Sequence, residues 1–489
     1  MSNKTYMEEL QKGDIYRIVA LMAFSGTLII YVETMIVPAI PVFITFFNTT
    51  YNNVSWILTA YLITGTVAAG IFGKLGDVFG KRRVFLILSF IYAVSVSLGG
   101  FATTLDELIA IRVVQGIGFG MYPLAYAIIN DVVPRAKLAL AQGLMSATFA
   151  VGAGIALVIG AYITETFSWE WSFHAIAPVA FILFILSYFY LKDAARPVKE
   201  KIDMAGVVIM AGALATLIFA LSEGNTYGWE SPLIIFLFIF SAIAFYSLTV
   251  YELNCKDAFI DMRLLKTRNV FIANFVGLFT MAGMYFLFFT VPTLLQDPAP
   301  SGFGRSILES GLIMLPATIL AMVFAPLAAR VTDRKGPKTA ILIGLIVSFL
   351  AFLLLLAHRG SVLDIIEAAA TLGSGFSFVL VGIINLLLIS TPKSMAGEAT
   401  GLNTVFRELG MTVAPAIGGT YETIYSVRVI IGLIPYRFNG FPFIPITYSF
   451  PSQTAYNFTY LTGIIFLLFA VLVTLFIKDK KGEKNENIQ

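Results

Sequence analysis

The chain has 489 residues, of which 58% are hydrophobic and only 12% are charged, and its formal net charge is +3. A soluble globular protein carries about 25% charged residues, so this composition excludes a soluble fold, and the small net charge gives no support for nucleic-acid binding. One cysteine, Cys255, and two distant histidines, His174 and His358, exclude an internal disulfide and offer no metal-ligand spacing.

Fourteen apolar segments, each long enough to cross a membrane as a helix, follow one another along the chain. They lie at roughly 15–40, 54–74, 83–101, 106–129, 139–163, 172–191, 204–222, 232–252, 270–293, 307–329, 338–357, 363–390, 398–425 and 455–477. Because lipid offers the backbone no hydrogen-bond partner, these segments form helices. The expected fold class is therefore all-α and polytopic, with 14 transmembrane helices and no cleaved signal peptide.

The basic residues are distributed unevenly between the two sides of the membrane. If the N-terminus is cytoplasmic, 26 of the 32 Lys and Arg fall in the tails, in the inner loops or at the inner ends of spans, and two, Arg112 and Arg407, lie deep inside spans. The remaining four, in outer loops, are Arg305, Arg359, Arg428 and Arg437. The positive-inside rule therefore predicts that both termini lie in the cytoplasm. The expected location is the cell (plasma) membrane, which the chain crosses many times.

The longest outer loop, at about 426–454, is rich in Pro, Gly and aromatic residues and is too broken for a helix. Its aromatic residues favour an interfacial loop at the membrane surface. A lid over the outer mouth is the alternative interpretation, and the sequence does not decide between them.

One short pattern occurs twice. The segment "GKLGDVFGKRR" at 73–83 follows the second span, and "ARVTDRKGPK" follows the tenth, so that Asp77 and Gly80 correspond to Asp333 and Gly336 at equal spacing. Both copies stand at the cytoplasmic end of the second helix of a six-helix set. The repeat therefore predicts two six-helix halves.

The domain organisation that follows has three parts. We expect an N-terminal six-helix half at 1–200, an inserted helix pair, spans seven and eight, at 201–256, and a C-terminal six-helix half at 257–489. Repeated halves around a binding site at the midplane are the architecture of alternating-access carriers.

The segment at 73–83 resembles the loop motif of the major facilitator superfamily nearly position for position. Gly73, Gly76 and Gly80 would allow a tight turn and close helix approach, and the basic residues would hold the loop at anionic headgroups. The resemblance implies that the Asp of the motif locks a cytoplasmic gate by pairing with a basic residue after the fourth span. The residues assigned to this gate are Gly73, Asp77, Gly80, Lys81, Arg82, Arg135 and Asp333.

A second motif of that superfamily resembles "LIAIRVVQGIGFG" in the fourth span, through Arg112, Gln115 and three glycines. An arginine in mid-membrane costs several kcal/mol, so it must face the bundle interior and find a partner. The resemblance implies a role for Arg112 in proton coupling. The alternative is structural, with Arg112 bonding to backbone carbonyls that brace neighbouring helices, while the glycines permit close packing.

Three further segments resemble the fourteen-span drug:proton antiporter branch, which is the multidrug efflux type. They are "SWEWSFHAIAP" at 168–178, "LSEGNTYGWESP" at 221–232 and "IDMRLLKTRNV" at 260–270. This resemblance implies secondary active export in exchange for protons by a functional monomer. In the fifth span, however, Ala156 and Leu157 stand where that branch has its Gly-Pro pair, and this weakens the prediction of antiport.

Glu33 is the only acid of the first span. A carboxyl in apolar surroundings can be neutral, so Glu33 is the first candidate for a proton or cation site, ahead of Glu367 and Glu422. The alternative is an inert, hydrogen-bonded carboxyl at the outer mouth. Glu33 lies one position from the acid that is usual in the branch. One residue rotates the side chain about the helix axis by about 100°, so the role of that acid does not transfer directly to Glu33. Candidates for a substrate cavity are Tyr31, Tyr61, Gln115, Tyr122, Tyr126, Tyr285 and Arg407.

The chain has no Gly-x-x-x-x-Gly-Lys loop and no nucleophile–base constellation, so neither ATP use nor an enzyme is predicted. The leading prediction is alternating-access export of small amphipathic compounds in exchange for protons. The alternatives are a proton-coupled or facilitative carrier of one metabolite and a non-transporting sensor on the same fold. The expected partners are a small-molecule substrate, protons and the lipid bilayer, with no cofactor.

Overall fold

The structure is a computed structural model and describes residues 12–191, 203–255, 262–391, 395–438 and 441–478. Almost all of the described chain is helical. In chain order the elements are α2 (Lys12–Thr34), η1 (Val37–Ala39), α3 (Ile40–Phe46), α4 (Tyr51–Phe79), α5 (Lys81–Gly99), α6 (Leu105–Ile117), η2 (Gly118–Gly120), α7 (Met121–Val132), α8 (Arg135–Ile155), η3 (Ala156–Gly160), α9 (Ala161–Thr166), α10 (Trp169–Tyr190), α11 (Met204–Tyr227), α12 (Pro232–Asn254), η4 (Met262–Lys266), α13 (Arg268–Gln296), α14 (Ile307–Lys335), α15 (Pro337–Ala357), α16 (Val362–Ser390), α17 (Ala396–Ile424), β1 (Ser426–Phe438), β2 (Phe441–Pro451) and α18 (Gln453–Leu475).

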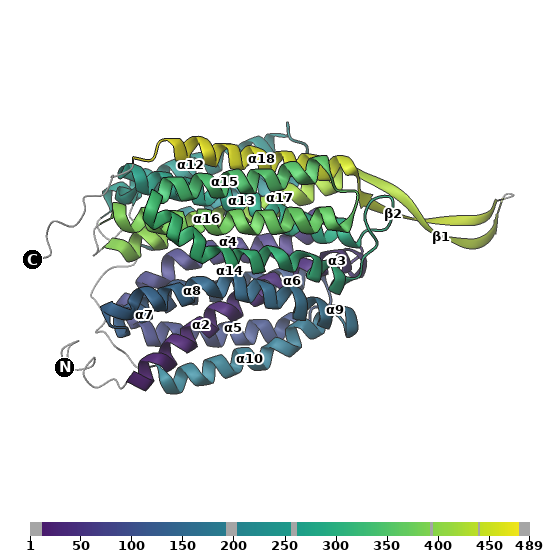
Figure 1. The fold of residues 1–489 in the computed structure, drawn as a ribbon. Coiled ribbons are helices and arrows are strands. Elements are labelled where there is room, and N and C mark those ends of the chain that lie inside the picture. The colour runs from purple at the N-terminus through teal and green to yellow at the C-terminus, as the bar shows by residue number, and fades with distance from the viewer. Residues whose placement is uncertain (1–11, 192–202, 256–261, 392–394, 439–440, 479–489) are drawn as a thin grey trace, which may run out of the picture.

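Thirteen helical stretches of the described chain are long and apolar enough to cross a membrane. They run side by side in one bundle (Figure 1). The helix α17 occupies the place of the thirteenth predicted span and is 29 residues long. It is less apolar than the others because it carries Arg407, Glu408 and Glu422. The all-α polytopic fold is confirmed, and α17 is the one predicted span that falls below this level of apolarity.

The two ends of the bundle differ (Figure 1). The start of α2 and the end of α18 lie at one end, which we call the terminal end. The strands β1 and β2 project from the opposite end, which we call the hairpin end. The start of α2 and the end of α18 lie together because an even number of helices runs along the bundle.

The strands β1 and β2 pair antiparallel, with Ser426 opposite Pro451 and Val429 opposite Tyr448. The segment at 426–454 was expected to be a loop and instead forms paired strands. Alternating β-branched and aromatic residues favour strands despite the prolines and glycines. The hairpin points away from the bundle rather than across it (Figure 1).

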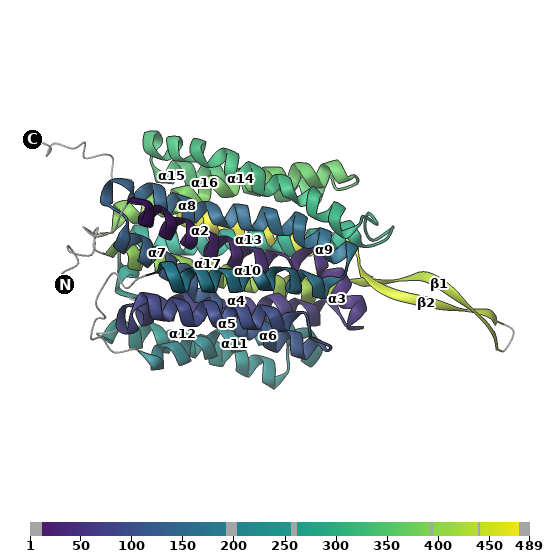
Figure 2. The same cartoon turned by 90° about the horizontal axis from the view of Figure 1, so that it is seen from below.

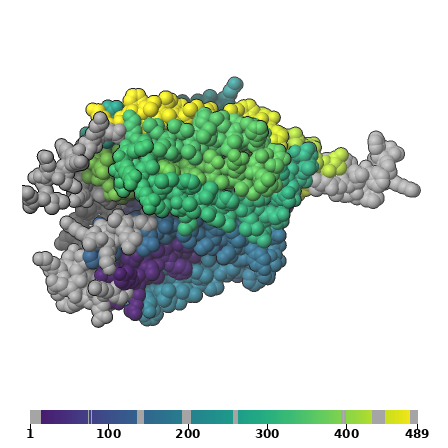
Figure 3. All heavy atoms as spheres, in the orientation of Figure 1, coloured from purple at the N-terminus to yellow at the C-terminus, as the bar shows by residue number. Residues whose placement is uncertain are grey.

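The helices before and after the α11–α12 pair form two groups. We call α2–α10 the N-terminal group and α13–α18 the C-terminal group. In the space-filling view the first is purple to blue and the second green to yellow, and they occupy separate parts of one face (Figure 3). The helices α11 and α12 pack on each other at one side of the bundle, where α11 also contacts α4 and α17 (Figure 2).

The repeated motif has the same backbone conformation in both copies. Gly80 ends α4 with a φ of 96°, and Gly336 ends α14 with a φ of 88°. Both helices have 29 residues. A positive φ is open to glycine at little cost, so each turn depends on its glycine. The predicted correspondence between Gly80 and Gly336 is confirmed.

Candidate functional site

Arg112 lies on α6 and is fully buried. Its Nε donates to the carbonyl of Ile57 at 3.2 Å, and its Nη1 donates to Gln115 Oε1 at 2.8 Å and to the carbonyl of Val32 at 3.4 Å. The guanidinium carbon also stands 4.0 Å from the centre of the Tyr61 ring, which adds a cation–π interaction. Arg112 therefore ties α6 to α2 and α4, as the structural interpretation of this residue expects.

The glycines after Arg112 explain how α4 and α5 come so close to α6. A Cβ on Gly116 would lie 2.5 Å from the carbonyl oxygen of Tyr61, and one on Gly118 would lie 2.1 Å from the Tyr92 ring. The predicted close packing at these glycines is confirmed. It is this approach that brings Tyr61 over the guanidinium of Arg112.

Glu33, near the end of α2, is buried with 1% of its surface exposed. The hydroxyl of Tyr285, on α13, donates to Glu33 Oε1, and Oε2 has no hydrogen-bond partner among the described residues. Glu33 interacts electrostatically with Arg112 but forms no direct ion pair with it. Glu33 thus lies in the interior, where it bonds the N-terminal group to the C-terminal group.

A second acid, Glu408 on α17, belongs to the same site and was missed from the sequence. Its side chain is 3% exposed, its Oε2 has no hydrogen-bond partner in the described chain, and it interacts electrostatically with Glu33 and Tyr285. A signal was present, because Glu408, Thr412 and Glu422 share one helical face and form a polar stripe.

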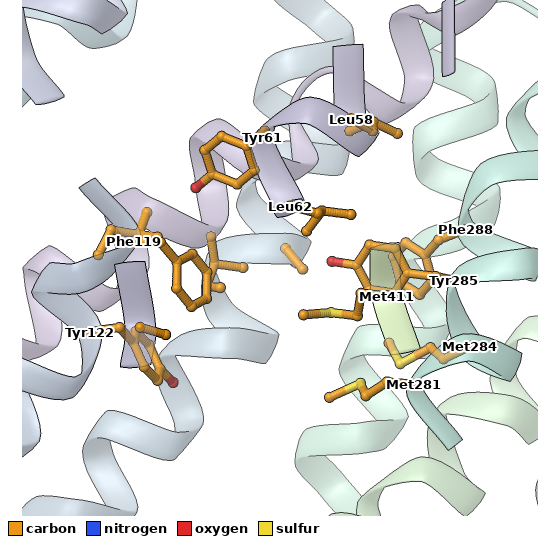
Figure 4. Packing of buried hydrophobic residues seen from close by; sticks show 14 of the residues in the cluster. Leu58, Tyr61, Leu62, Phe119, Tyr122, Met281, Met284, Tyr285, Phe288 and Met411 are labelled. Atoms are coloured by element: carbon orange, nitrogen blue, oxygen red, sulfur yellow. The ribbon is translucent and has the colours of Figure 1, made fainter. Parts of the chain in front are cut away.

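Apolar side chains from both groups lie around Glu33. Figure 4 shows Tyr61, Phe119 and Tyr122 on one side and residues of the C-terminal group on the other. Tyr285 and Phe288 stack with ring centres 6.1 Å apart. Beside them lie three buried methionines that the sequence did not single out, namely Met281, Met284 and Met411 (Figure 4).

A small enclosed cavity adjoins the acid. It measures about 10 Å³, roughly the space of one water molecule. Its lining includes Glu33, Tyr285, Met284, Phe149 and Phe288. The cavity therefore lies where α2, α8 and α13 meet.

The predicted cavity residues have different surroundings. Tyr285 contacts the acid, whereas Tyr61 and Gln115 are held by Arg112, and Gln115 Nε2 also donates to the Ser95 carbonyl at 3.0 Å. The remaining ones are Tyr31, Tyr122, Tyr126 and Arg407. Tyr31 is buried, Tyr122 packs on Tyr126 with ring centres 5.6 Å apart, and Arg407 is half-buried and interacts electrostatically with Tyr122.

The basic residues of the loop motif have protein partners. Lys81 Nζ bonds to Asp131 Oδ2 at 2.7 Å, and Arg82 donates to the carbonyls of Tyr188 and Leu191 at the C-terminal end of α10. A cation at a helix C-terminus is favoured by the helix dipole. Lys81 and Arg82 therefore fasten α5 to α7 and α10, and the expected headgroup contact does not describe these two side chains.

Other gate residues were only partly as expected. A Cβ added to Gly73 would meet no atom within 4 Å, so the expectation of a close approach there was wrong, whereas Gly76 closely faces Leu124. Asp333 is exposed, and no hydrogen bond or ion pair of its side chain is found in the described chain. The side chains of Asp77 and Arg135 lie outside the described part, so their pairing stays a prediction.

The fifth span departs from a regular α-helix where the Gly-Pro pair of the branch is missing. Residues Ala156–Gly160 form a π-helical turn between α8 and α9. The carbonyl oxygen of Leu157 lies 1.9 Å from where a Cβ on Gly311 would stand, so α14 packs directly on this turn. A π-helical turn is rare and is often found at functional sites.

This is a bundle of membrane-spanning helices with an arginine buried in the N-terminal group and two acids buried where the two groups meet. Such an arrangement defines a multi-pass membrane transporter. The family profile described as Major Facilitator Superfamily matches residues 22–415. The chain belongs to this superfamily.

The relatives of this chain include multidrug transporters and a resistance and export protein. The chain is 31% identical over 390 residues to the multidrug transporter protein MdtP of Bacillus subtilis, covering 79% of this chain and 71% of that one. It is 27% identical to multidrug resistance protein 3 of B. subtilis, over 76% of this chain and 73% of that one. It is also 27% identical to the tetracenomycin C resistance and export protein of Streptomyces glaucescens, over 75% and 68%. The resemblance to the multidrug efflux type is confirmed.

Solved structures share the fold. The xylose transporter XylE of E. coli superposes with a TM-score of 0.64 at 14% identity, covering 96% of this chain and 100% of that one. The nucleoside transporter NupG superposes with a TM-score of 0.60 at 13% identity, covering 94% and 99%. At this identity the likeness concerns the fold.

Proposed function

We propose that this transporter exports small amphipathic compounds in exchange for protons by alternating access. The observation that carries the proposal is the contact between Glu33 and Tyr285, which joins the two helix groups beside a second buried acid, Glu408. The multidrug and export relatives support the same substrate class.

The pair of acids gives the site its proton chemistry. Ionised carboxylates buried without partners cost several kcal/mol, and Glu33 and Glu408 each have one unpartnered oxygen in the described chain. At least one proton on the pair removes most of that cost. When the two groups separate, water reaches the site and the proton can leave. A substrate that binds better to the deprotonated site would then exchange with it, as linkage requires.

The lining of the site favours amphipathic substrates. Methionine side chains adapt to differently shaped partners, and Met281, Met284 and Met411 lie on the C-terminal side. Aromatic rings and the Glu33 carboxylate would attract a cationic group. An inward proton supplies about 2.3 kcal/mol per 100 mV of membrane potential.

We place the terminal end in the cytoplasm and the protein in the cell membrane, as a functional monomer. The distribution of Lys and Arg supports this orientation. At that end we propose a gate in which Asp77 pairs with Arg135. Asp77→Asn should stop transport while the protein remains folded, and transport at the wild-type rate would remove the gate from the proposal.

The proposal is tested in proteoliposomes with an imposed pH gradient and a panel of fluorescent amphipathic cations. Gradient-driven accumulation of a cationic dye, abolished by an uncoupler, is the expected result. Accumulation of the dye to the same level with and without the pH gradient would exclude proton exchange.

A carrier of one metabolite, proton-coupled or facilitative, is the second candidate. The absence of the Gly-Pro pair at Ala156 and Leu157 favours it, because that pair is associated with antiport in the branch that the chain resembles. A parallel panel of metabolites in the same proteoliposomes separates the two. Transport of one metabolite and of no dye would favour this candidate.

A further inference from the structure

The structure is closed at the hairpin end by hydrogen bonds between the two helix groups. The backbone nitrogen of Asn52, on α4, donates to Thr423 Oγ1, on α17, at 3.0 Å. Gln296 Nε2, on α13, donates to the carbonyl of Pro38 at 2.7 Å. These bonds must break if this end opens.

Asp297 lies inside the closed end, directly after α13, and is 3% exposed. The hydroxyl of Tyr51, on α4, stands 3.2 and 3.3 Å from its two carboxyl oxygens, and Tyr456 on α18 donates to Oδ2 at 3.3 Å. Tyr51 belongs to the N-terminal group and Asp297 to the C-terminal side. The carboxyl of Asp297 is therefore bound across the closure.

Glu422, on α17, is fully buried, and neither of its carboxyl oxygens has a hydrogen-bond partner among the described residues. It interacts electrostatically with Asp297, Tyr51 and Tyr456, so it is directed into the same site. An unpartnered carboxylate in such surroundings costs several kcal/mol, and a neutral acid costs much less. The closed end therefore favours the neutral carboxyl of Glu422 over the carboxylate.

The other titratable groups near these acids leave the pair without a positive partner. Glu223 Oε1, on α11, accepts hydrogen bonds from Asn52 at 3.4 Å and from Trp56 at 3.2 Å. Arg359 stands 5.8 Å from the centre of the Tyr460 ring on α18. In the described chain no basic side chain forms an ion pair with Asp297 or Glu422.

We propose that Asp297 and Glu422 form a second proton-binding site, separate from Glu33, whose protonation closes the hairpin end. Opening this end would admit water to both carboxyls, which then ionise and release protons to that side. Closing would take protons up again from the same water. The site acts without substrate, so it does not rest on the proposed export.

The sign of the pH dependence follows from burial. Burial raises the pKa of Asp297 to about 7, although the hydrogen bonds from Tyr51 and Tyr456 oppose the rise. A carboxyl that binds its proton more tightly in the closed state favours closing at low pH. The closed state loses this advantage as the pH rises from the ordinary carboxyl range through about 7, and the unpartnered Glu422 acts in the same direction.

The experiment measures closure directly. Spin labels are attached at Asn53→Cys on α4 and Thr454→Cys on α18, two exposed positions of the hairpin end, in a Cys255→Ser background. Distances are recorded by pulsed electron spin resonance in lipid nanodiscs without substrate, from pH 5 to pH 8.5. We expect a short distance at pH 5 and a growing population at longer distance toward pH 8.5. For each proton bound on closing, the closed-to-open ratio changes by at most about tenfold per pH unit.

Single-residue variants show which acid causes the pH-dependent change in distance. Glu422→Gln and Glu422→Leu both remove the ionisable group, and either one should hold the short distance further toward pH 8.5. Glu367→Gln, at an exposed acid on α16, is the matched control and should respond as the wild type does. Glu33→Gln should also keep the response.

Three outcomes would overturn the proposal. They are a wild-type distance that does not change with pH, neutral Glu422 variants that open as the wild type does, and a response that disappears in Glu33→Gln.

Discussion

The hydroxyl of Tyr285 on α13 donates a hydrogen bond to Glu33 on α2, across 252 positions of the sequence. Through this bond a neutral donor from one helix group meets an acid from the other. Any rearrangement that separates the groups must break it, so the protonation of Glu33 and the relative position of the groups are physically linked.

Glu33→Gln should retain folding and exchange of substrate without a gradient, but lose proton-driven accumulation. The amide resembles the protonated acid permanently, so the site can no longer load and release a proton. The measurement compares gradient-driven efflux with energy-independent exchange in liposomes, with the exposed Glu367→Gln as control. A Gln variant that still concentrates substrate would move the coupling role to another acid, first to Glu408.

Tyr285→Phe should slow transport while leaving the protein folded. The ring keeps its stacking on Phe288, but Glu33 loses the one hydrogen bond that its side chain makes among the described residues. A hydrogen bond to a charged group contributes about 1.5–3 kcal/mol. Tyr246→Phe on α12 is the control, because its ring is exposed and lies on a helix outside both groups. Equal transport rates in the two variants would show that the bond to Glu33 has no part in transport.

Arg112→Gln should lower the stability of the folded protein by about 2–4 kcal/mol. The shorter, neutral side chain cannot reach the carbonyls of Val32 and Ile57 and loses the cation–π contact with Tyr61. Thermal unfolding of purified protein in detergent checks this directly. Unchanged stability with lost proton coupling would mean that Arg112 acts in coupling rather than in bracing the helices.

Gly80→Ala should destabilise the turn between α4 and α5 by about 1–2 kcal/mol, because an L-residue with a side chain is strained at a positive φ. Gly73→Ala on the same helix is the control. Nothing lies within 4 Å of its added methyl group, and alanine favours a helix over glycine. Thermal unfolding should therefore rank Gly73→Ala at or above the wild type and Gly80→Ala below it, and the opposite order would contradict the structure of the turn.

Impermeant thiol reagents should establish the orientation in the membrane. In a Cys255→Ser background, Glu230→Cys at the hairpin side and Asp333→Cys at the terminal end are both exposed positions. We expect labelling of Glu230→Cys in intact cells, and of Asp333→Cys only after the membrane is permeabilised. The reverse pattern would place the termini outside.

The sequence was sufficient for the features that a single segment determines. Apolar length predicted the helices, the repeated loop predicted matching turns at Gly80 and Gly336, and an arginine in a span predicted an interior position. Features that depend on which helices become neighbours were not predictable in this way. No local pattern shows that Tyr285 reaches Glu33, or that Glu408 faces the same site.

The hairpin and the two loop cations, Lys81 and Arg82, illustrate a second reason why parts of the structure could not be predicted from the sequence. Proline and glycine at 426–454 ruled out a helix, but the choice between loop and strands depended on pairing between two segments. Lys81 and Arg82 suited a lipid headgroup as well as a protein partner, and tertiary packing supplied Asp131 and the end of α10 instead.

The low apolarity of α17 has a consequence for how the protein is made. At the centre of a span, an arginine or an acidic residue opposes insertion from the translocon by about 2.5–3.5 kcal/mol, and α17 carries Arg407 and Glu408 near its centre. This cost is too large for α17 to be stable alone in lipid. Because α4 and α13 pack along it, the helices synthesised earlier provide the surface that it enters. Biogenesis of the C-terminal helices is therefore cooperative, and a chain that ends after α17 but lacks α4 would be expected to leave this helix outside the bilayer.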